Sequence, residues 1–226
     1  MANLSGASWL ARHRTQEIQT VSLEPHPLAQ RLIDAAADAS RFVVALAGPP
    51  GAGKSTLSER LCAAIDAQCP GQIVVVPMDG YHFDNTVIGD AQLPIKGAPH
   101  TFDVDGLRTD LQRIRRAEGG VAVPVFDRLL DLARAGGRMV TLEHRIVLVE
   151  GNYLLLDQAP WCDLAPLFDF SVMLDVEDAE LERRLIERWL GMGQDAEAAF
   201  DKARNKDMVN VRLVKRHSRT PDLVWR

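Results

Sequence analysis

The sequence of 226 residues predicts an α/β protein whose mainly parallel central sheet lies between layers of helices. Residues 73–76 and 146–149 are apolar at every position, which is typical of strands buried on both faces. Segments with helical spacing of apolar residues alternate with such runs, and this order favours parallel strands joined by helices. The sequence therefore predicts a three-layer α/β/α fold.

The first part of the chain leads into this fold. Residues 1–27 form a weakly organised N-terminal lead-in, with a short helix at about 9–18 and a break at Pro25-His26-Pro27. A single domain then covers 28–226, a length that fits one hydrophobic core. It opens with an amphipathic helix on which Leu28, Leu32 and Ala36 share one face.

The remaining elements follow in order along the domain. The spacing and composition predict strands at 42–47, 73–76, 146–149, 170–176 and 223–225, a short edge strand at 138–142, and helices at about 57–65, 104–117 and 178–190. A segment at 121–126 alternates around Pro124. At about 183–210 a charged helical stretch is interrupted by Gly191-Met192-Gly193, and we expect a mobile lid there.

Composition limits the classes of function. The formal net charge of −5 gives no electrostatic reason to expect a nucleic acid or an anionic membrane as partner. The three cysteines form no C-x-x-C pair, which argues against a disulfide framework or a zinc site. No apolar run approaches the ~18–20 residues of a spanning helix, and no signal-peptide pattern is visible. We expect a cytoplasmic protein that acts on a small molecule.

One loop carries the clearest motif in the chain. The strand at 42–47 runs into Gly48-Pro49-Pro50-Gly51-Ala52-Gly53-Lys54-Ser55-Thr56, a complete match to G-x-x-x-x-G-K-[ST]. Glycines let backbone N–H groups surround phosphate oxygens, and the following helix adds its positive end. We predict that the loop binds a nucleoside triphosphate, with Lys54 at the β/γ-phosphates and the Ser55 hydroxyl on Mg²⁺.

Two carboxylates follow strands of the predicted sheet. Asp79 comes after the strand at 73–76, and Glu150 follows the strand at 146–149. Ligands of open α/β sheets bind at the carboxyl ends of the strands, so both side chains should lie near the phosphates. Glu150 fits a role in organising Mg²⁺. The loop at 83–103 is long, polar and interrupted by glycine and proline, and we assign it to the acceptor side of the site.

The motifs together resemble a known family. Five motifs carry the resemblance: the phosphate loop, Met78-Asp79-Gly80-Tyr81-His82, the run at 96–103, Phe126-Asp127-Arg128 and Glu150-Gly151-Asn152-Tyr153. Together they are similar to motifs of the P-loop kinases that include uridine kinase, phosphoribulokinase and bacterial type I pantothenate kinase. Among these the chain is most similar to small bacterial proteins described as fructose transport system kinases. The resemblance covers residues 28–226 and implies a kinase-type P-loop NTPase fold that uses ATP and Mg²⁺.

The resemblance also implies roles for individual residues. Asp79 would take the proton of the acceptor hydroxyl and Glu150 would support Mg²⁺, although the choice of base between them stays open. Arg188, with Arg184 as a second candidate, would reach the transferring phosphate from the lid. Candidates for holding the acceptor are Tyr81, His82, Lys96, His100, Phe102, Asp103, Asp127 and Arg128.

We therefore predict an ATP-dependent kinase that transfers the γ-phosphate to a hydroxyl of a small molecule, a sugar or a sugar-like compound such as fructose. The fructose-like acceptor rests on the family description alone. A nucleoside or pantothenate-like acceptor is the alternative, and Gly80-Tyr81-His82 is nearer the pantothenate kinase pattern than the Asp-Phe-Tyr pattern of uridine kinase. A P-loop switch or a regulatory nucleotide-binding module without an acceptor is a further alternative. A GTPase is disfavoured, because Asn205-Lys206-Asp207 lacks the spacer of the guanine-reading motif. The oligomeric state, monomer or homodimer, stays open.

Overall fold

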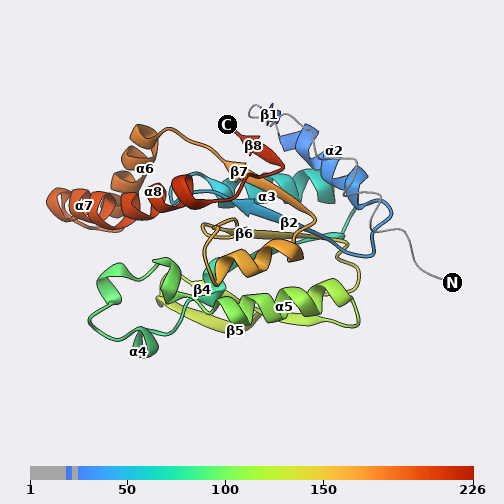
Figure 1. Cartoon of the computed structure of the whole chain (residues 1–226), viewed down its shortest axis with the longest axis horizontal. Helices are drawn as coiled ribbons and strands as arrows, with labels where there is room; N and C mark the ends of the chain where they lie inside the picture. Colours follow the sequence, from blue (N-terminus) through green and yellow to red (C-terminus); the bar gives the residue numbers. More distant parts are fainter. Residues whose placement is uncertain (1–18, 22–24) are drawn as a thin grey trace.

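The structure is a computed structural model that describes residues 19–21 and 25–226. Its centre is a six-stranded sheet in the order β1-β8-β7-β2-β6-β3, in which every pair of neighbours is parallel (Figure 1). The strands are β1 (Gln19–Val21), β2 (Phe42–Ala47), β3 (Ile73–Pro77), β6 (Ile146–Gly151), β7 (Phe170–Leu174) and β8 (Leu223–Trp225). The predicted parallel sheet is confirmed.

Helices cover both faces of this sheet. Alternate residues of β2 belong to two separate cores: Val44 and Leu46 pack with one set of helices, whereas Val43 and Ala45 face the other side. The first side is covered by α2 (Pro25–Ala36), α3 (Lys54–Asp66) and α6 (Asp178–Gly191), and the second by α5 (Val104–Arg116) together with the chain after β6. This arrangement gives the three layers that the alternating elements predict.

The N-terminal boundary differs from the prediction. α2 begins at Pro25, so the prolines expected to break the chain form the first turn of the helix. Proline is tolerated there because the first N–H groups of a helix have no partner within it. β1 pairs with β8 and adds a strand inside the segment predicted as a lead-in. The short helix predicted at about 9–18 lies outside the described residues.

A two-stranded antiparallel hairpin stands apart from the central sheet. It consists of β4 (Val121–Asp127) and β5 (Leu132–Val140), with an irregularity between Val123 and Val125. The short edge strand predicted at 138–142 is therefore the last part of a longer strand that pairs with β4. Arg138 links the hairpin to the sheet, because its guanidinium donates to the carbonyl oxygen of Val75 over 2.6 Å.

The acceptor loop, residues 83–103, leaves the same end of the sheet as the helices after β7 (Figure 1). It contains one short helix, α4 (Asn85–Ile88), and two 3₁₀ turns. Tyr153 and Trp161 anchor it, since the Tyr153 hydroxyl donates to the Gly97 carbonyl over 2.6 Å and the Trp161 indole donates to the Pro99 carbonyl over 3.3 Å. The loop is thus fixed to the chain that follows β6.

The region predicted as a lid is helical but not uniformly exposed. After α6 come α7 (Ala196–Lys202), a π-helical turn (Ala203–Asp207) and α8 (Met208–His217). Ala203 and Met208, in the second half of the predicted 183–210 region, are buried in the core of the domain, so this part of the region is packed against the domain. In the described part of the chain, no helix is both long and apolar enough to cross a membrane.

Candidate active site

The phosphate loop connects β2 to α3. Gly51 and Gly53 have φ angles of +81° and +91°, a region of backbone conformation in which side chains are strained. Gly53 directly precedes α3, so the turn places the first residues of the helix at the cavity. The first N–H groups of a helix lack partners within it, so this end of α3 is suited to an anion.

Lys54 is buried at the start of α3, with 8% of its surface exposed. Its ammonium donates to the carbonyl oxygen of Pro49 over 3.0 Å. Burial lowers the pKa of Lys54 to about 8, although the nearby carboxylates of Glu150 and Asp79 oppose this shift. A buried ammonium with a lowered pKa is stabilised by an anionic ligand, which a phosphate group would supply.

Ser55 and Glu150 bring α3 and the end of β6 together. The Ser55 hydroxyl donates to Glu150 Oε1 over 3.1 Å, and the Ser58 hydroxyl donates to Oε2 over 3.4 Å. Burial raises the pKa of Glu150, while Lys54 and the two hydroxyls act in the opposite direction. The carboxylate and the Ser55 hydroxyl are therefore adjacent oxygen ligands beside the phosphate loop.

These oxygens fit the needs of Mg²⁺. The ion usually takes one or two protein oxygens, several waters and substrate phosphates. Within residues 19–21 and 25–226 no group of three or more His, Cys, Asp or Glu side chains could hold a metal. Ser55 and Glu150 thus match a site completed by phosphate oxygens and water.

Asp79 lies just beyond β3, in a 3₁₀ turn (Met78–Tyr81). Its Oδ2 accepts a hydrogen bond from the guanidinium of Arg128 over 2.8 Å, which links β3 to the hairpin. Gly80 allows this approach: a Cβ there would lie 2.3 Å from the carbonyl oxygen of Pro124. The other carboxylate oxygen of Asp79 accepts no hydrogen bond from the described residues.

A single cavity of about 630 Å³ joins these groups. It extends from the phosphate loop past Asp79 and Glu150 to the acceptor loop, the hairpin and the helices after β7. Pockets of ~300–1,000 Å³ typically hold small molecules. The cavity therefore brings the loop with the G-x-x-x-x-G-K-[ST] motif, two carboxylates and residues of the loop at 83–103 around one space.

Four of the predicted acceptor residues line this cavity. They are His82, Lys96, Phe102 and Arg128. The His82 ring lies between the tilted rings of Phe102 and Phe126, whose centroids are 4.0 Å and 4.7 Å away, and burial lowers the pKa of His82. His82 Nδ1 also contacts the Asp79 backbone carbonyl over 2.8 Å. His82 is therefore held rigidly beside Asp79.

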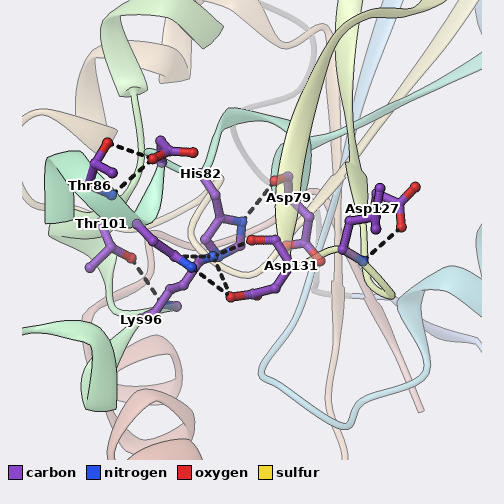
Figure 2. Close-up of polar contacts among 11 residues, drawn as sticks. Asp79, His82, Thr86, Lys96, Thr101, Asp127 and Asp131 are labelled. Carbon is purple, nitrogen blue, oxygen red and sulfur yellow. Dashed lines mark hydrogen bonds and ion pairs between the residues drawn. The ribbon is translucent and has the colours of Figure 1, made fainter. Parts of the chain in front are cut away.

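Lys96 reaches from the acceptor loop to the hairpin (Figure 2). Its Nζ lies 2.7 Å from Asn85 Oδ1, 2.8 Å from the Asp131 carbonyl oxygen and 3.0 Å from Asp131 Oδ2. The ammonium also lies 5.1 Å from the centroid of the Phe126 ring. Lys96 thus joins the loop to the hairpin at the wall of the cavity.

The other four predicted acceptor residues do not line the cavity. The Tyr81 hydroxyl donates to Asp110 over 3.0 Å, and His100 Nε2 contacts Gln92. Asp127 accepts from the backbone N–H groups of 129 and 130, and Asp103 caps α5. These side chains make contacts that support the fold around the site, and the structure does not bring them to the acceptor space.

The two lid arginines have different surroundings. Arg188 lines the cavity, close enough for its charge to lower the pKa of Lys54. Arg184 instead pairs with Glu180 over 2.7 Å and donates to the Gly51 carbonyl over 3.3 Å. Arg188 is thus placed to meet a phosphate in the cavity, whereas Arg184 braces the phosphate loop from outside.

Several lining residues were not predicted as site residues. The hairpin contributes Asp131 and also Phe126, which the sequence indicates only as part of a family motif. The region predicted as a lid contributes Trp189, Lys206 and Asp207. Trp189 donates from its indole to Asp207 Oδ2 over 2.7 Å. Asp207 ends a π-helical turn, a feature that often marks functional sites but that sequence spacing does not reveal.

A second cavity of about 390 Å³ begins at Pro49 and runs along the ends of β7 and β8. Its walls include Asp175, Lys215 and Arg219. Ser218 also lines it, and its hydroxyl is buried and has no hydrogen-bond partner in the described part of the chain. This cavity shares Pro49 with the phosphate loop and contains no acceptor-loop residue.

Comparisons with known proteins place the chain in a family. A Schizosaccharomyces pombe protein named "Putative uridine kinase" is 31% identical over an alignment of 206 positions, which covers 87% of this chain and 88% of the relative. The Escherichia coli protein YggC is 35% identical over 226 residues, covering 98% of this chain and 92% of the relative. A Myxococcus xanthus pantothenate kinase is 29% identical, but only 51% of its length is matched.

A solved structure gives the same result. The structure described as a "putative fructose transport system kinase" from Silicibacter sp. TM1040 has a TM-score of 0.83 and 40% identity, with 91% of this chain and 100% of that chain covered. No model of a protein family matches the chain. The chain belongs to the P-loop kinases related to uridine kinase and pantothenate kinase, phosphotransferases that use ATP and take an alcohol group of a small molecule as acceptor.

Proposed function

We propose that this kinase transfers the γ-phosphate of ATP to a hydroxyl of a sugar or sugar-like compound, with fructose as the first candidate. The observation that carries the proposal is the placement of Asp79. Its carboxylate lines the same cavity as Lys54, is fixed by Arg128 through one oxygen and leaves the other oxygen available. A base in this position can hold an acceptor hydroxyl between itself and the phosphates.

The reaction then needs little beyond positioning and charge. Asp79 takes the proton of the acceptor hydroxyl, and the oxygen of that hydroxyl bonds to the γ-phosphorus of ATP. The bond between the γ-phosphorus and the oxygen that bridges to the β-phosphate breaks, and ADP is released. Lys54 from the loop and Arg188 from the lid balance the negative charge that spreads over the transferring group. Ser55 and Glu150 would hold Mg²⁺, which neutralises charge on the β- and γ-phosphates when bound.

The second cavity is a candidate site for the nucleoside part of ATP. The phosphates occupy the loop between Gly48 and Thr56, so the nucleoside must leave in a direction away from Asp79. The space beyond Pro49, along the ends of β7 and β8, is our candidate for the nucleoside. The 630 Å³ cavity is then left to the phosphates and a small acceptor.

Two observations support a sugar-like acceptor. The acceptor end of the cavity presents carboxylate, ammonium and guanidinium groups, which match a compound with many hydroxyls better than an apolar slot would. The Silicibacter structure, which the chain matches over 91% of its length, is described as a fructose transport system kinase. We also propose that residues at about 183–210 act as a lid that closes over the bound substrates.

An ADP-release screen tests the proposal. The purified protein with Mg·ATP is tested against ketoses, aldoses, sugar alcohols, uridine and pantothenate, with Asp79→Asn as the matched control. We expect ADP release that depends on a sugar or sugar alcohol and is lost in the Asp79→Asn variant. Release driven by uridine or pantothenate would assign the acceptor to those classes instead. ATP hydrolysis that no acceptor stimulates would overturn the proposed transfer.

A further inference from the structure

The acceptor end of the cavity is lined by Asp79, His82, Lys96, Arg128 and Asp131. We propose that this end accepts an uncharged polyhydroxy compound and that Asp131 makes it reject the carboxylate- or phosphate-bearing counterparts. The inference rests on the proposed kinase function and narrows its acceptor class. It follows from how the charged groups of this region are paired.

Lys96 has no donor left for a ligand. An ammonium group has three N–H donors. Three oxygens surround the ammonium group of Lys96: Asn85 Oδ1 at 2.7 Å, the Asp131 carbonyl oxygen at 2.8 Å and Asp131 Oδ2 at 3.0 Å (Figure 2). Only 9% of the Lys96 side chain is exposed. An anionic acceptor could use this cation only by breaking contacts that already neutralise it.

Asp131 presents negative charge to the same space. Its Oδ2 is occupied by Lys96 and by the Asn85 amide at 3.1 Å, whereas no described residue donates to Oδ1. Burial raises the pKa of Asp131, but the hydrogen bonds from Lys96 and Asn85 outweigh burial, so its pKa is lowered and the group stays ionised. Oδ1 can therefore accept from a hydroxyl and repels a carboxylate or phosphate.

Arg128 is neutralised in the same way. Its guanidinium pairs with Asp79 Oδ2 over 2.8 Å, and the remaining Asp79 oxygen is the one assigned to the acceptor hydroxyl. His82, the remaining titratable group of this end, is buried, and burial lowers its pKa toward the neutral form. Lys96 and Arg128, the two cations contributed by the loop at 83–103 and the hairpin, are therefore each paired with a carboxylate.

The helices after β7 contribute Lys206, Asp207 and Arg188 to the cavity wall. Lys206 and Asp207 are adjacent lining residues, and Asp207 and Asp131 both attract the Lys206 ammonium. Across the hairpin, the acceptor loop and the lid, Asp79, Asp131 and Asp207 therefore balance Arg128, Lys96 and Lys206. Arg188 also lines the cavity, and its charge acts on Lys54 as well as on Lys206 and Asp207. The proposed function assigns this fourth cation to the phosphates of the bound nucleotide.

This balance discriminates by charge. A hydroxyl both donates and accepts hydrogen bonds, so it can pair with either carboxylate. A carboxylate or phosphate has only acceptors to offer, and an unpaired anion removed from water is costly. Specificity of this kind arises from the penalty imposed on the wrong ligand. The site should therefore select against acceptors by their charge even where their hydroxyls match.

Paired acceptors test the inference. We compare kcat/KM for fructose with fructose 6-phosphate, glucitol with gluconate, and pantothenyl alcohol with pantothenate. The wild-type enzyme is expected to use neutral members and to discriminate against their anionic partners. Asp131→Asn leaves the Lys96 charge without its carboxylate. It is expected to shift this ratio toward the anionic member by about tenfold, because the repulsion between Asp131 and an anionic acceptor is removed.

Two controls separate charge from damage to the fold. Asp127→Asn removes a carboxylate of the same hairpin that does not line the cavity, and it should leave the ratio unchanged. Lys96→Gln combined with Asp131→Asn restores neutrality, and the ratio should return toward the wild-type value. A wild-type preference for anionic members, or an unchanged ratio in an active Asp131→Asn enzyme, would overturn the inference and leave the kinase function intact. A lack of transfer to any member would instead count against the proposed function.

Discussion

The hydroxyl of Ser55 donates to the carboxylate of Glu150 over 3.1 Å. This hydrogen bond connects the helix after the phosphate loop to the end of β6, a strand of the central sheet. Ser58, one helical turn further, donates to the second oxygen of the same carboxylate. The orientation of Glu150 is thus set by α3 itself. Any shift of the loop and its helix on nucleotide binding would move this carboxylate with it.

Removing the charge of Glu150 should weaken the use of Mg²⁺. We expect Glu150→Gln to raise the Mg²⁺ concentration needed for half-maximal activity by about 10–100-fold, the range typical of groups that support a metal site. Ser58→Ala removes only one hydrogen bond to the carboxylate and should have a smaller effect in the same direction. The measurement is a Mg²⁺ titration of initial rates at saturating ATP. An unchanged titration for Glu150→Gln would remove Glu150 from the metal site.

The lowered pKa of Lys54 predicts how stability depends on pH. Between about 8 and the ordinary value of 10.5, the unfolded chain holds a proton on Lys54 that the folded protein has lost. Unfolding then takes up protons, so the free energy of unfolding rises with pH across this window. The rise should be on the order of 1–3 kcal/mol. Denaturant titrations of the nucleotide-free protein at pH 7.5–10.5 should show it relative to Lys54→Met, and parallel curves for the two proteins would contradict it.

Substitution of Asp79 should separate binding from turnover. Asp79→Asn keeps the shape of the side chain but removes the base, so kcat should fall by about 10²–10⁴. The affinity for Mg·ATP, measured by calorimetry, should stay near the wild-type value because the carboxylate contacts the acceptor side. A comparable loss of nucleotide affinity would place Asp79 on the metal and move the role of base to Glu150.

The lid arginine can be tested against a neighbour on the same helix. Arg188→Ala should lower kcat by about 10²–10³, the cost of removing one group that stabilises transition-state charge. Arg183 is the matched control, since it pairs with Glu180 and Glu187 on the solvent side of α6. Amide exchange of residues 183–210 should also slow when ATP and acceptor are bound together. Equal effects of the two substitutions, or unchanged exchange, would count against a closing lid.

Gly80 predicts a defect confined to the acceptor side. In Gly80→Ala the new Cβ would lie 2.3 Å from the Pro124 carbonyl oxygen, so the hairpin must move away from the turn that carries Asp79. This movement should break the Asp79–Arg128 pair and lower kcat/KM for the acceptor by at least about tenfold, because a displacement near 1 Å is costly in catalysis. Nucleotide affinity is the internal control and should persist. An unaffected acceptor KM would show that the hairpin adapts.

Local patterns in the sequence predicted the donor half of the site. The apolar runs, the glycine loop and the residues directly after β3 and β6 are contiguous in the chain, so their spacing places Lys54, Asp79 and Glu150 before any tertiary contact is known. The observed sheet and the shared cavity agree with that placement.

The acceptor half depends on contacts between distant residues. Lys96 meets Asp131 across 35 positions, and the hairpin forms although Pro124 and paired glycines weaken the strand pattern. Tyr81, His100 and Asp127 have the same chemistry as the cavity residues, and only the three-dimensional arrangement shows that they point to other partners. Asp207 was not recognisable because its position depends on a π-helical turn.

The anchoring of the acceptor loop has a consequence for how new enzymes of this kind could arise. Tyr153 and Trp161 fix the loop at Gly97 and Pro99, and both follow β6, the strand that carries Glu150. Residues 84–95 lie between that anchor and the turn after Asp79, and they can vary without disturbing either attachment. A change of acceptor could therefore evolve by replacing this one segment and the tip of the hairpin, while the machinery that handles ATP is inherited unchanged.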